Sequence, residues 1–207
     1  MKISKDLWFN TFSSNPRTIC ELGTGGSTEV FQCKNFLDLK DSKFILVEVN
    51  PASFSIVKSN FGDKDNFSLY NKAICDENKI IKFYNRFGID AENACGYIEG
   101  AISPVVIKHG EEVPIYEQSA INVEGIKFSE IDDGQIDILF CDLEGAEWYA
   151  LKHMISEPKI ISVETHAPDY FGARYVNSHI NEIENYLKDK GYSLINRDDS
   201  DSLYFKK

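Results

Sequence analysis

The chain has 207 residues and a formal net charge of -11. This acidic balance argues against a nucleic-acid partner or a membrane-surface partner, because either would require a basic face on the protein. No apolar run reaches the ~20 residues needed to span a bilayer, and the N-terminal residues lack the apolar core of a signal peptide.

The first predicted elements lead into a ligand site. Thr18–Leu22 is expected to be a buried strand, and the glycine-rich turn Gly23–Gly26 follows it and opens a helix over Ser27–Phe36. Such a turn lets the backbone approach a ligand, and the N-terminus of a helix favours negative charge. A second strand, Lys43–Val49, brings Glu48 to the place about 20 residues further on where such folds hold a ribose. The pattern therefore predicts a nucleoside-bearing cofactor.

The residues around the turn favour one cofactor over another. A dinucleotide fingerprint requires a glycine at its sixth position, where this chain has Thr28. Glu21 would repel a pyrophosphate but would suit an ammonium group. S-adenosylmethionine has an ammonium group, a carboxylate for the glycine amides and a ribose for Glu48. NAD is the alternative cofactor. A further alternative is that the glycine turn has a purely structural role and binds no ligand.

The rest of the chain continues the alternation of strands and helices, with one interruption at residues 79–133. That interruption is rich in glycine and proline but contains apolar side chains, and we expect it to be an insertion on the substrate side. The five cysteines have no zinc-ligand spacing, which suits a cytoplasmic protein. The expected elements are helices at Pro51–Asn60, Ala146–Ile155 and Asn177–Lys190, strands at Phe67–Ile74, Ile136–Asp142 and Ile160–Glu164, and a terminal antiparallel pair at Tyr192–Asn196 and Ser202–Phe205.

Five blocks of residues occur in order along the chain: Glu21–Gly26, Val47–Pro51, Asn71–Asp76, Asp142–Glu147 and Val163–His166. Together they resemble the FkbM-type S-adenosylmethionine-dependent methyltransferases, and the fourth block is the most specific. The resemblance covers nearly the whole chain. It implies one domain over residues 1–207 with the α/β, Rossmann-like class I methyltransferase fold. That fold has a mostly parallel seven-stranded sheet with a terminal antiparallel strand, here with an insertion between strands three and four.

The resemblance also implies an activity and a cofactor site. Such enzymes use S-adenosylmethionine, release S-adenosylhomocysteine and typically methylate hydroxyl groups of sugars, glycans or small natural products. Glu21 would lie near the methionine ammonium, and the backbone of Gly23, Gly25 and Gly26 would surround the methionine. Glu48 would accept hydrogen bonds from the ribose hydroxyls.

Further site residues are expected at the ends of later strands. Ala73 would lie near the adenine. Asp142 and His166 are both expected at the carboxyl edge of the sheet, where open sheets bind ligands, and one of them would be the general base. His166 has the better intrinsic pKa, whereas Asp142, also assigned to the cofactor site, would need its pKa raised by burial. Glu144 is the third catalytic candidate, close to the same site.

Other interpretations of these acids stay open. Glu147 is assigned to the first turn of its helix, where a carboxylate compensates the helix dipole. Asp142, Glu144, Glu164 and His166 could gather a divalent cation, but acid clusters at strand ends are common without one, so no metal is predicted. The acceptor is expected to be a small molecule or a glycan, and a homo-oligomer stays open. The alternative functions are an NAD-binding enzyme and a non-catalytic interaction module.

Overall fold

The computed structural model of this chain describes most of its residues, in stretches separated by gaps. They are residues 17–25, 33, 36–37, 39–85, 100–102, 105–108, 111–114, 120–165, 177–197 and 201–207. No helix within these stretches is long and apolar enough to cross a membrane. The predicted helix Ser27–Phe36 lies almost wholly outside them and stays a prediction.

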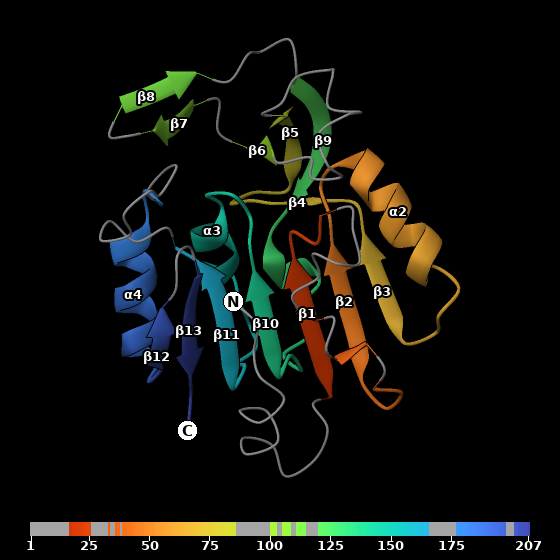
Figure 1. Ribbon diagram of the computed structural model, residues 1–207, viewed down its shortest axis with the longest axis vertical. Helices are drawn as coiled ribbons and strands as arrows, with labels where there is room; N and C mark the ends of the chain where they lie inside the picture. Colours follow the sequence, from red (N-terminus) through yellow and green to blue (C-terminus); the bar gives the residue numbers. More distant parts are fainter. Residues whose placement is uncertain are drawn as a thin grey trace.

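A seven-stranded sheet forms the centre of the molecule (Figure 1). Its strands are β1 (Thr18–Leu22), β2 (Lys43–Val47), β3 (Phe67–Tyr70), β10 (Ile138–Cys141), β11 (Ile160–Glu164), β12 (Ser193–Arg197) and β13 (Asp201–Phe205). They are arranged in the order β12-β13-β11-β10-β1-β2-β3. The strands from β11 to β3 pair in parallel, whereas β13 runs antiparallel to both of its neighbours. This arrangement confirms the predicted fold class.

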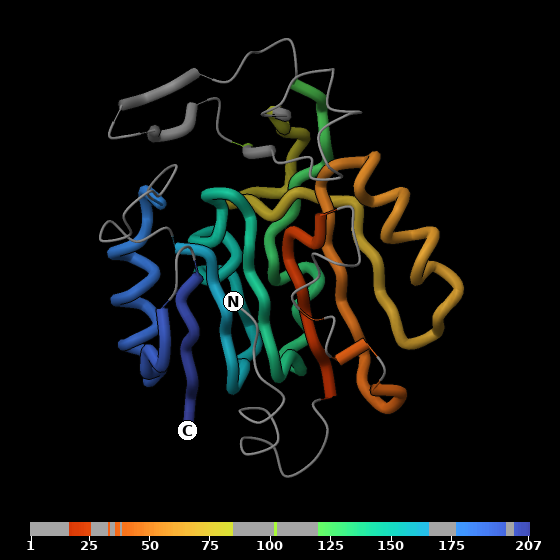
Figure 2. Tube along the Cα trace, viewed as in Figure 1, coloured from red at the N-terminus to blue at the C-terminus, as the bar shows by residue number. Residues whose placement is uncertain are grey.

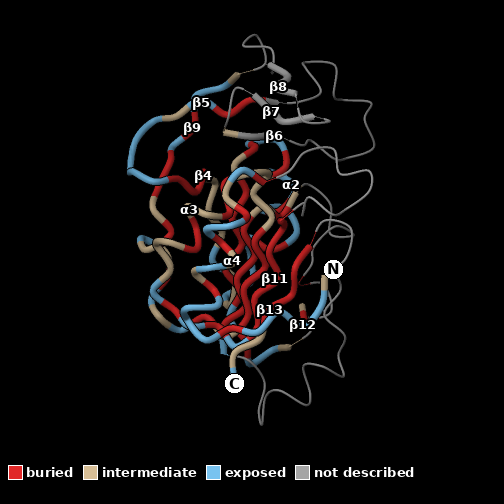
Figure 3. The backbone as a smooth tube through the Cα atoms, turned by 90° about the vertical axis from the view of Figure 1, so that its left-hand side faces the viewer, coloured by how far each residue is buried: buried red, intermediate tan, exposed pale blue. Residues whose placement is uncertain are grey.

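Helices cover both faces of this sheet, because its central strands are apolar on both sides. Every residue of β1, β10 and β11 is buried, and Figure 3 shows buried backbone running through the middle of the molecule, at and behind β11. The helices α3 (Glu147–Lys152) and α4 (Ile180–Asp189) contribute to one apolar cluster, and α2 (Pro51–Phe61) contributes to the other. In Figure 2, β1 lies between β2 and β10, so segments distant in the sequence meet at the centre.

The helix predicted at Ala146–Ile155 is shorter than expected, since α3 ends at Lys152. Beyond the helix, the carboxylate of Asp132 accepts hydrogen bonds from the N–H groups of Ile155, at 2.7 Å, and Ser156, at 2.8 Å, which hold the chain in a non-helical path. Ile155 consequently points outward and is 58% exposed.

The strand predicted at Phe67–Ile74 is in fact two strands in different sheets. β3 ends at Tyr70 in the main sheet, and β4 (Ala73–Ile74) pairs with a strand of a second sheet. The side chain of Asn71 lies at the break, where its Nδ2 donates to the carbonyl oxygens of Glu48, at 2.7 Å, and Val49, at 3.1 Å. These bonds turn the chain out of the main sheet.

The second sheet lies above the carboxyl ends of the main parallel strands in Figure 1. Its order is β4-β9-β5-β6, and a separate pair, β7 and β8, follows β6 in the chain. All of these strands come between β3 and β10 in sequence, which confirms the predicted insertion between the third and fourth strands of the main sheet. Their bounds are β5 (Lys79–Asn85), β6 (Gly100–Ala101), β7 (Val105–Lys108), β8 (Glu111–Pro114) and β9 (Ala120–Ile126), followed by the short 3-10 helix η4 (Phe128–Glu130).

Candidate active site

The turn after β1 fits tightly between the ends of two neighbouring strands. Gly23 has a φ of 82°, and its N–H donates to the carbonyl oxygen of Val47 at 2.9 Å. A Cβ at this position would lie 1.7 Å from the carbonyl oxygen of Asp142. Only glycine can occupy such a position, because both the φ angle and the close backbone approach exclude a side chain. The turn therefore brings β1, β2 and the segment after β10 together.

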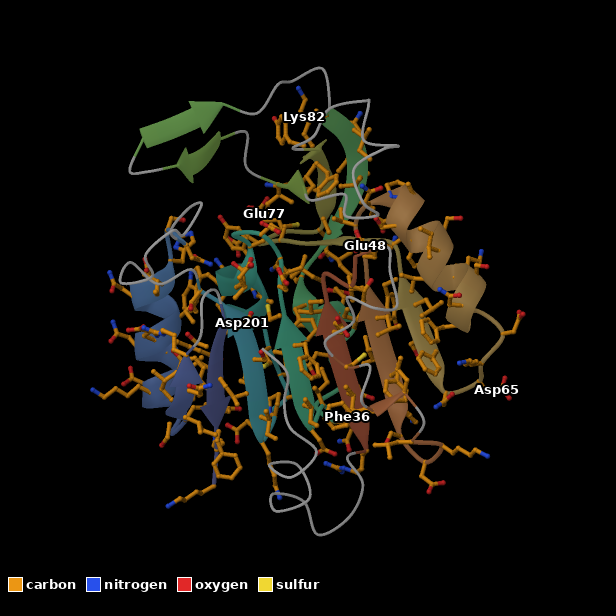
Figure 4. The ribbon with its side chains drawn as sticks, viewed as in Figure 1. Phe36, Glu48, Asp65, Glu77, Lys82 and Asp201 are labelled. Carbon is orange, nitrogen blue, oxygen red and sulfur yellow. The ribbon has the colours of Figure 1, made fainter. Side chains whose placement is uncertain are left out.

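Glu48 follows β2 and faces this turn. Glu48 is buried, with 6% of its surface exposed, so it is not a solvated acid at the strand end. Its Oε2 accepts a hydrogen bond from the N–H of Gly25 at 2.7 Å, and its Oε1 accepts one from Asn50 at 2.7 Å. Burial raises the pKa of Glu48 to about 7, although these hydrogen bonds act in the opposite direction. Figure 4 shows Glu48 at the upper end of the main sheet.

Glu21 lies in β1 between Cys20 and Leu22, which pack in the cluster that includes α3 and α4, so its side chain faces the opposite side of the sheet. It is 2% exposed, and its Oε2 accepts a hydrogen bond from the N–H of Cys33 at 3.1 Å. The structure thus shows Glu21 holding the segment that follows the glycine turn. Its predicted contact with a methionine ammonium stays a prediction.

Ala73, the expected adenine neighbour, is placed where the two sheets meet. It is 2% exposed in β4 and belongs to a small apolar cluster with Phe83 and Val123 of the second sheet. Val49, just beyond the end of β2, packs against the same cluster. The apolar surroundings and the nearness to Glu48 suit an adenine base, and the contact itself stays a prediction.

Three carboxylates converge where β10 and β11 end. The side chains of Asp142, Glu144 and Glu164 each place an oxygen within 4.8 Å of the others, close enough for one divalent cation to contact all three. Asp201 is paired with Glu164 across β11 and β13. Burial, followed by the charges of Glu164 and Glu144, raises the pKa of Asp142 well above its usual range.

The sequence did not indicate Asp201 as a site residue. It begins a strand, whereas the other acids of this cluster lie at or just after the end of a strand. Because β13 runs antiparallel to β11, its first residue reaches the edge where the parallel strands end. Figure 4 shows Asp201 there, at the start of β13. The expected reversal of the last strand was the signal that could have found it.

Two predicted site residues lie outside the described part of the chain. Gly26 follows the described portion of the glycine turn, and His166 comes directly after Thr165, the last described residue of its stretch. The choice between Asp142 and His166 as the base therefore stays open. Of the two, Asp142 is the one whose surroundings the structure shows.

Comparison with known proteins assigns the chain to a family. A family model described as the methyltransferase FkbM domain matches residues 25–194, which is most of the chain. No curated protein sequence matches it. The chain therefore belongs to the FkbM family of S-adenosylmethionine-dependent methyltransferases, which confirms the family and the cofactor class predicted from its motifs.

Solved structures share the fold at low sequence identity. Methyltransferase FkbM from Methylobacillus flagellatus KT is 9% identical, with a TM-score of 0.53 over 92% of this chain and 43% of that chain. This chain thus spans less than half the length of that protein. A putative caffeoyl-CoA O-methyltransferase from Staphylococcus aureus is 14% identical, with a TM-score of 0.46 over 92% of this chain and 76% of that chain. Aeropyrum pernix fibrillarin, solved with natively bound S-adenosyl-L-methionine, is 12% identical, with a TM-score of 0.47 over 96% and 71%.

Proposed function

We propose that this chain transfers the methyl group of S-adenosylmethionine to a hydroxyl group of a sugar, a glycan or a small natural product. The observation that carries the proposal is the position of Asp142. Its backbone packs directly on Gly23 of the glycine turn, and its carboxylate lies among those of Glu144 and Glu164. A proton acceptor of raised pKa therefore stands beside the turn expected to hold the methionine end of the donor.

The cofactor would be held by residues that already converge on the turn. Glu48 would bond the ribose hydroxyls in exchange for some of the hydrogen bonds that it now accepts from Gly25, Asn50, Val49 and Thr24. The backbone of Gly23 and Gly25 would approach the methionine, with Glu21 on the ammonium. Ala73 would contact the adenine from the side of the second sheet.

The reaction itself requires little covalent help from the protein. The acceptor oxygen attacks the methyl carbon in line, the bond from that carbon to the sulfonium sulfur breaks, and the hydroxyl proton passes to a base. We assign the base to Asp142, because its position beside the turn and its raised pKa make it a stronger proton acceptor than an ordinary aspartate. The products are the methyl ether, S-adenosylhomocysteine and a proton released from the enzyme.

No metal is required by this scheme, because the sulfonium already carries an activated methyl group. The carboxylates of Asp142, Glu144 and Glu164 nevertheless have the chemistry of a divalent-cation site. If a cation acted there, it would lower the pKa of the acceptor hydroxyl in place of a protein base. Transfer that survives a chelator would favour Asp142, and transfer restored only by added magnesium would favour the cation.

Two measurements test the proposal. Isothermal titration with S-adenosylhomocysteine and with NAD should show binding of the first only, and preferential binding of NAD would contradict the proposed donor. Release of S-adenosylhomocysteine from S-adenosylmethionine should then be measured with hydroxylated sugars and phenols, alongside matched amines in which an amino group replaces the hydroxyl. Transfer to the hydroxyl compounds is expected. Transfer confined to the amines would contradict O-methylation, and firm binding without any transfer would favour the non-catalytic module.

A further inference from the structure

The acidic turn Asp142–Gly145 adopts an unusual backbone conformation. Glu144 has a φ of 54°, in the left-handed region that non-glycine residues rarely occupy, and Gly145 follows with a φ of 104°. Left-handed residues with a side chain carry strain and persist only where the surroundings hold them. Since Asp142 and Glu144 are both candidates for the chemistry, whatever holds this turn also sets their positions.

The buried carboxylate of Glu147 makes the contacts that could hold the turn. Glu147 is 0% exposed, and its Oε1 accepts a hydrogen bond from the N–H of Leu143 at 2.7 Å. Both of its oxygens lie 3.1 Å from the N–H of Gly145. These two amides stand on either side of Glu144, the strained residue. Glu147 therefore does more than compensate the dipole of α3, which was its expected role.

A second buried side chain fixes the other side of that carboxylate. Asn177 is 2% exposed, and its Nδ2 donates to the Oε2 of Glu147 at 2.5 Å. The Oδ1 of Asn177 accepts a hydrogen bond from the N–H of His179 at 2.9 Å, just before α4 begins. The orientation of the Asn177 amide is thereby set, because turning it over would place two acceptors against each other at Glu147 and two donors against each other at His179.

We propose that Glu147 and Asn177 form a buried pair of positioning residues, which holds the acidic turn in the conformation that presents Asp142 and Glu144 to the acceptor. The inference deepens the proposed methyl transfer and rests on it. Neither side chain needs to touch the substrate. The pair also ties the turn to the start of α4, so that two segments distant in the sequence hold the reacting edge together.

Exchanging the two functional groups tests the pair. In Glu147→Gln an amide N–H₂ faces the N–H₂ of Asn177, and in Asn177→Asp two carboxylates face each other. In the double variant the new glutamine donates to the new aspartate, and its oxygen still accepts from Leu143, so the donor and acceptor pattern is restored. Asp132→Asn is the matched control, because Asp132 is another buried carboxylate that accepts backbone hydrogen bonds, away from the turn.

The deciding measurement is the rate of amide hydrogen exchange at Leu143 and Gly145, detected by NMR. Each single variant should exchange at least tenfold faster at these two amides, and the double variant should return to within threefold of the wild type. Asp132→Asn should leave both amides unchanged. Unchanged exchange in the single variants, or no recovery in the double variant, would overturn the proposal.

The catalytic side is measured on the same proteins with the best hydroxylated acceptor from the panel. We expect kcat to fall in the single variants, where exchange is faster, and to recover in the double variant, where exchange slows again. The affinity for S-adenosylhomocysteine should stay within threefold of the wild type in all of them. Normal kcat in variants whose turn exchanges fast would overturn the positioning role. If the wild type neither binds S-adenosylhomocysteine nor transfers a methyl group, the proposed function fails, and the positioning role that rests on it fails with it. The exchange data would still show whether the pair holds the turn.

Discussion

The two ends of the central strands of the main sheet both carry carboxylates, but use them differently. At the edge where β10 and β11 begin, Asp132 is 2% exposed and accepts hydrogen bonds from three backbone N–H groups and one hydroxyl. At the edge where they end, Asp142, Glu144 and Glu164 face one another. A carboxylate surrounded by donors fixes a turn, whereas carboxylates that face each other hold a proton more tightly. Only the second arrangement is suited to proton transfer.

Removing the carboxylate of Asp142 should have the largest effect on function. We expect Asp142→Asn to lower methyl transfer by about 10²- to 10⁴-fold, the usual contribution of a general base. Stability should not fall, because the change relieves repulsion from Glu164 and Glu144. Initial rates of S-adenosylhomocysteine release, with thermal unfolding of both proteins, provide the measurement. His166→Asn is the companion variant, and if it alone abolishes transfer, the base is the histidine.

The opposite edge should respond in the opposite way. In the wild type, backbone N–H groups donate to both oxygens of Asp132. In Asp132→Asn an amide N–H₂ replaces one of these oxygens, so at least one backbone N–H loses its acceptor. We expect the free energy of unfolding to fall by about 1–3 kcal/mol, the usual penalty for a buried unsatisfied donor. Urea denaturation measures this loss. Methyl transfer per folded molecule should stay at the wild-type level, and a large loss of transfer in a fully folded variant would break the distinction between the two edges.

The strand-end acids could be predicted because their position depends only on the alternation of strands and helices. Glu48 and Asp142 each follow a buried parallel strand, and parallel strands end at one edge. The spread of the third predicted strand over two sheets could not be read in the same way. It depends on the side chain of Asn71, which bonds two carbonyl oxygens near the end of β2. The residues around Asn71 give no local sign of that contact.

The pair of residues that holds the acidic turn, Glu147 and Asn177, could not be predicted from the sequence either. Glu147 was expected in the first turn of a helix, and it does begin α3. Its contact with Asn177 joins residues 30 positions apart, and no spacing or periodicity links an acid on one helix to an amide before another. Such pairs follow from how the helices pack on the sheet, which is why local patterns pointed to the candidate acids at the strand ends but not to the residues that hold their turn.

Glu48 lies at the same end of the strands as Asp142, and its role can be tested through the pH dependence of cofactor binding. Burial raises its pKa to about 7, and the ionised carboxylate accepts hydrogen bonds from the ribose hydroxyls more strongly than the protonated acid does. Affinity for S-adenosylhomocysteine should therefore rise as the pH increases from 6 to 8. We expect Glu48→Gln to bind about tenfold more weakly at pH 8, within the range for losing a charged hydrogen bond. Calorimetry at several pH values measures this, with Asp132→Asn as the control that keeps the wild-type pH dependence.

The same shift has a consequence for stability. The ordinary pKa of Glu48 is 4.5, so between pH 4.5 and about 7 the folded protein binds more protons at this residue than the unfolded chain does. Its contribution to stability is therefore present at low pH and is lost as the pH rises towards 7. Glu48→Gln should flatten this part of the pH profile, and an unchanged profile would show that the buried carboxyl does not titrate there.

Substitution of Asp76 should have the smallest effect on stability and on methyl transfer. Asp76 is an exposed acid near the site, so it tests whether position alone makes an acid part of the reaction. It follows β4, and its Oδ1 lies 2.7 Å from the Nζ of Lys152 and 2.7 Å from the Nε2 of His153, at the end of α3. Its side chain is 49% exposed, so salt screens these contacts. Hydrogen bonds from Lys152 and His153 lower the pKa of Asp76 from 3.8 to about 2.

The stabilising contribution of Asp76 is therefore present above pH 3.8 and disappears as the pH falls through about 2. Asp76→Asn should lower the thermal midpoint only slightly at pH 6, and the difference should vanish in high salt or near pH 2. Methyl transfer should be unchanged, because an exposed acid with cationic partners has no raised affinity for protons. A large loss of transfer would mean that an acid of this protein takes part in the reaction because it lies near the carboxyl ends of the strands, and not because like charges surround it.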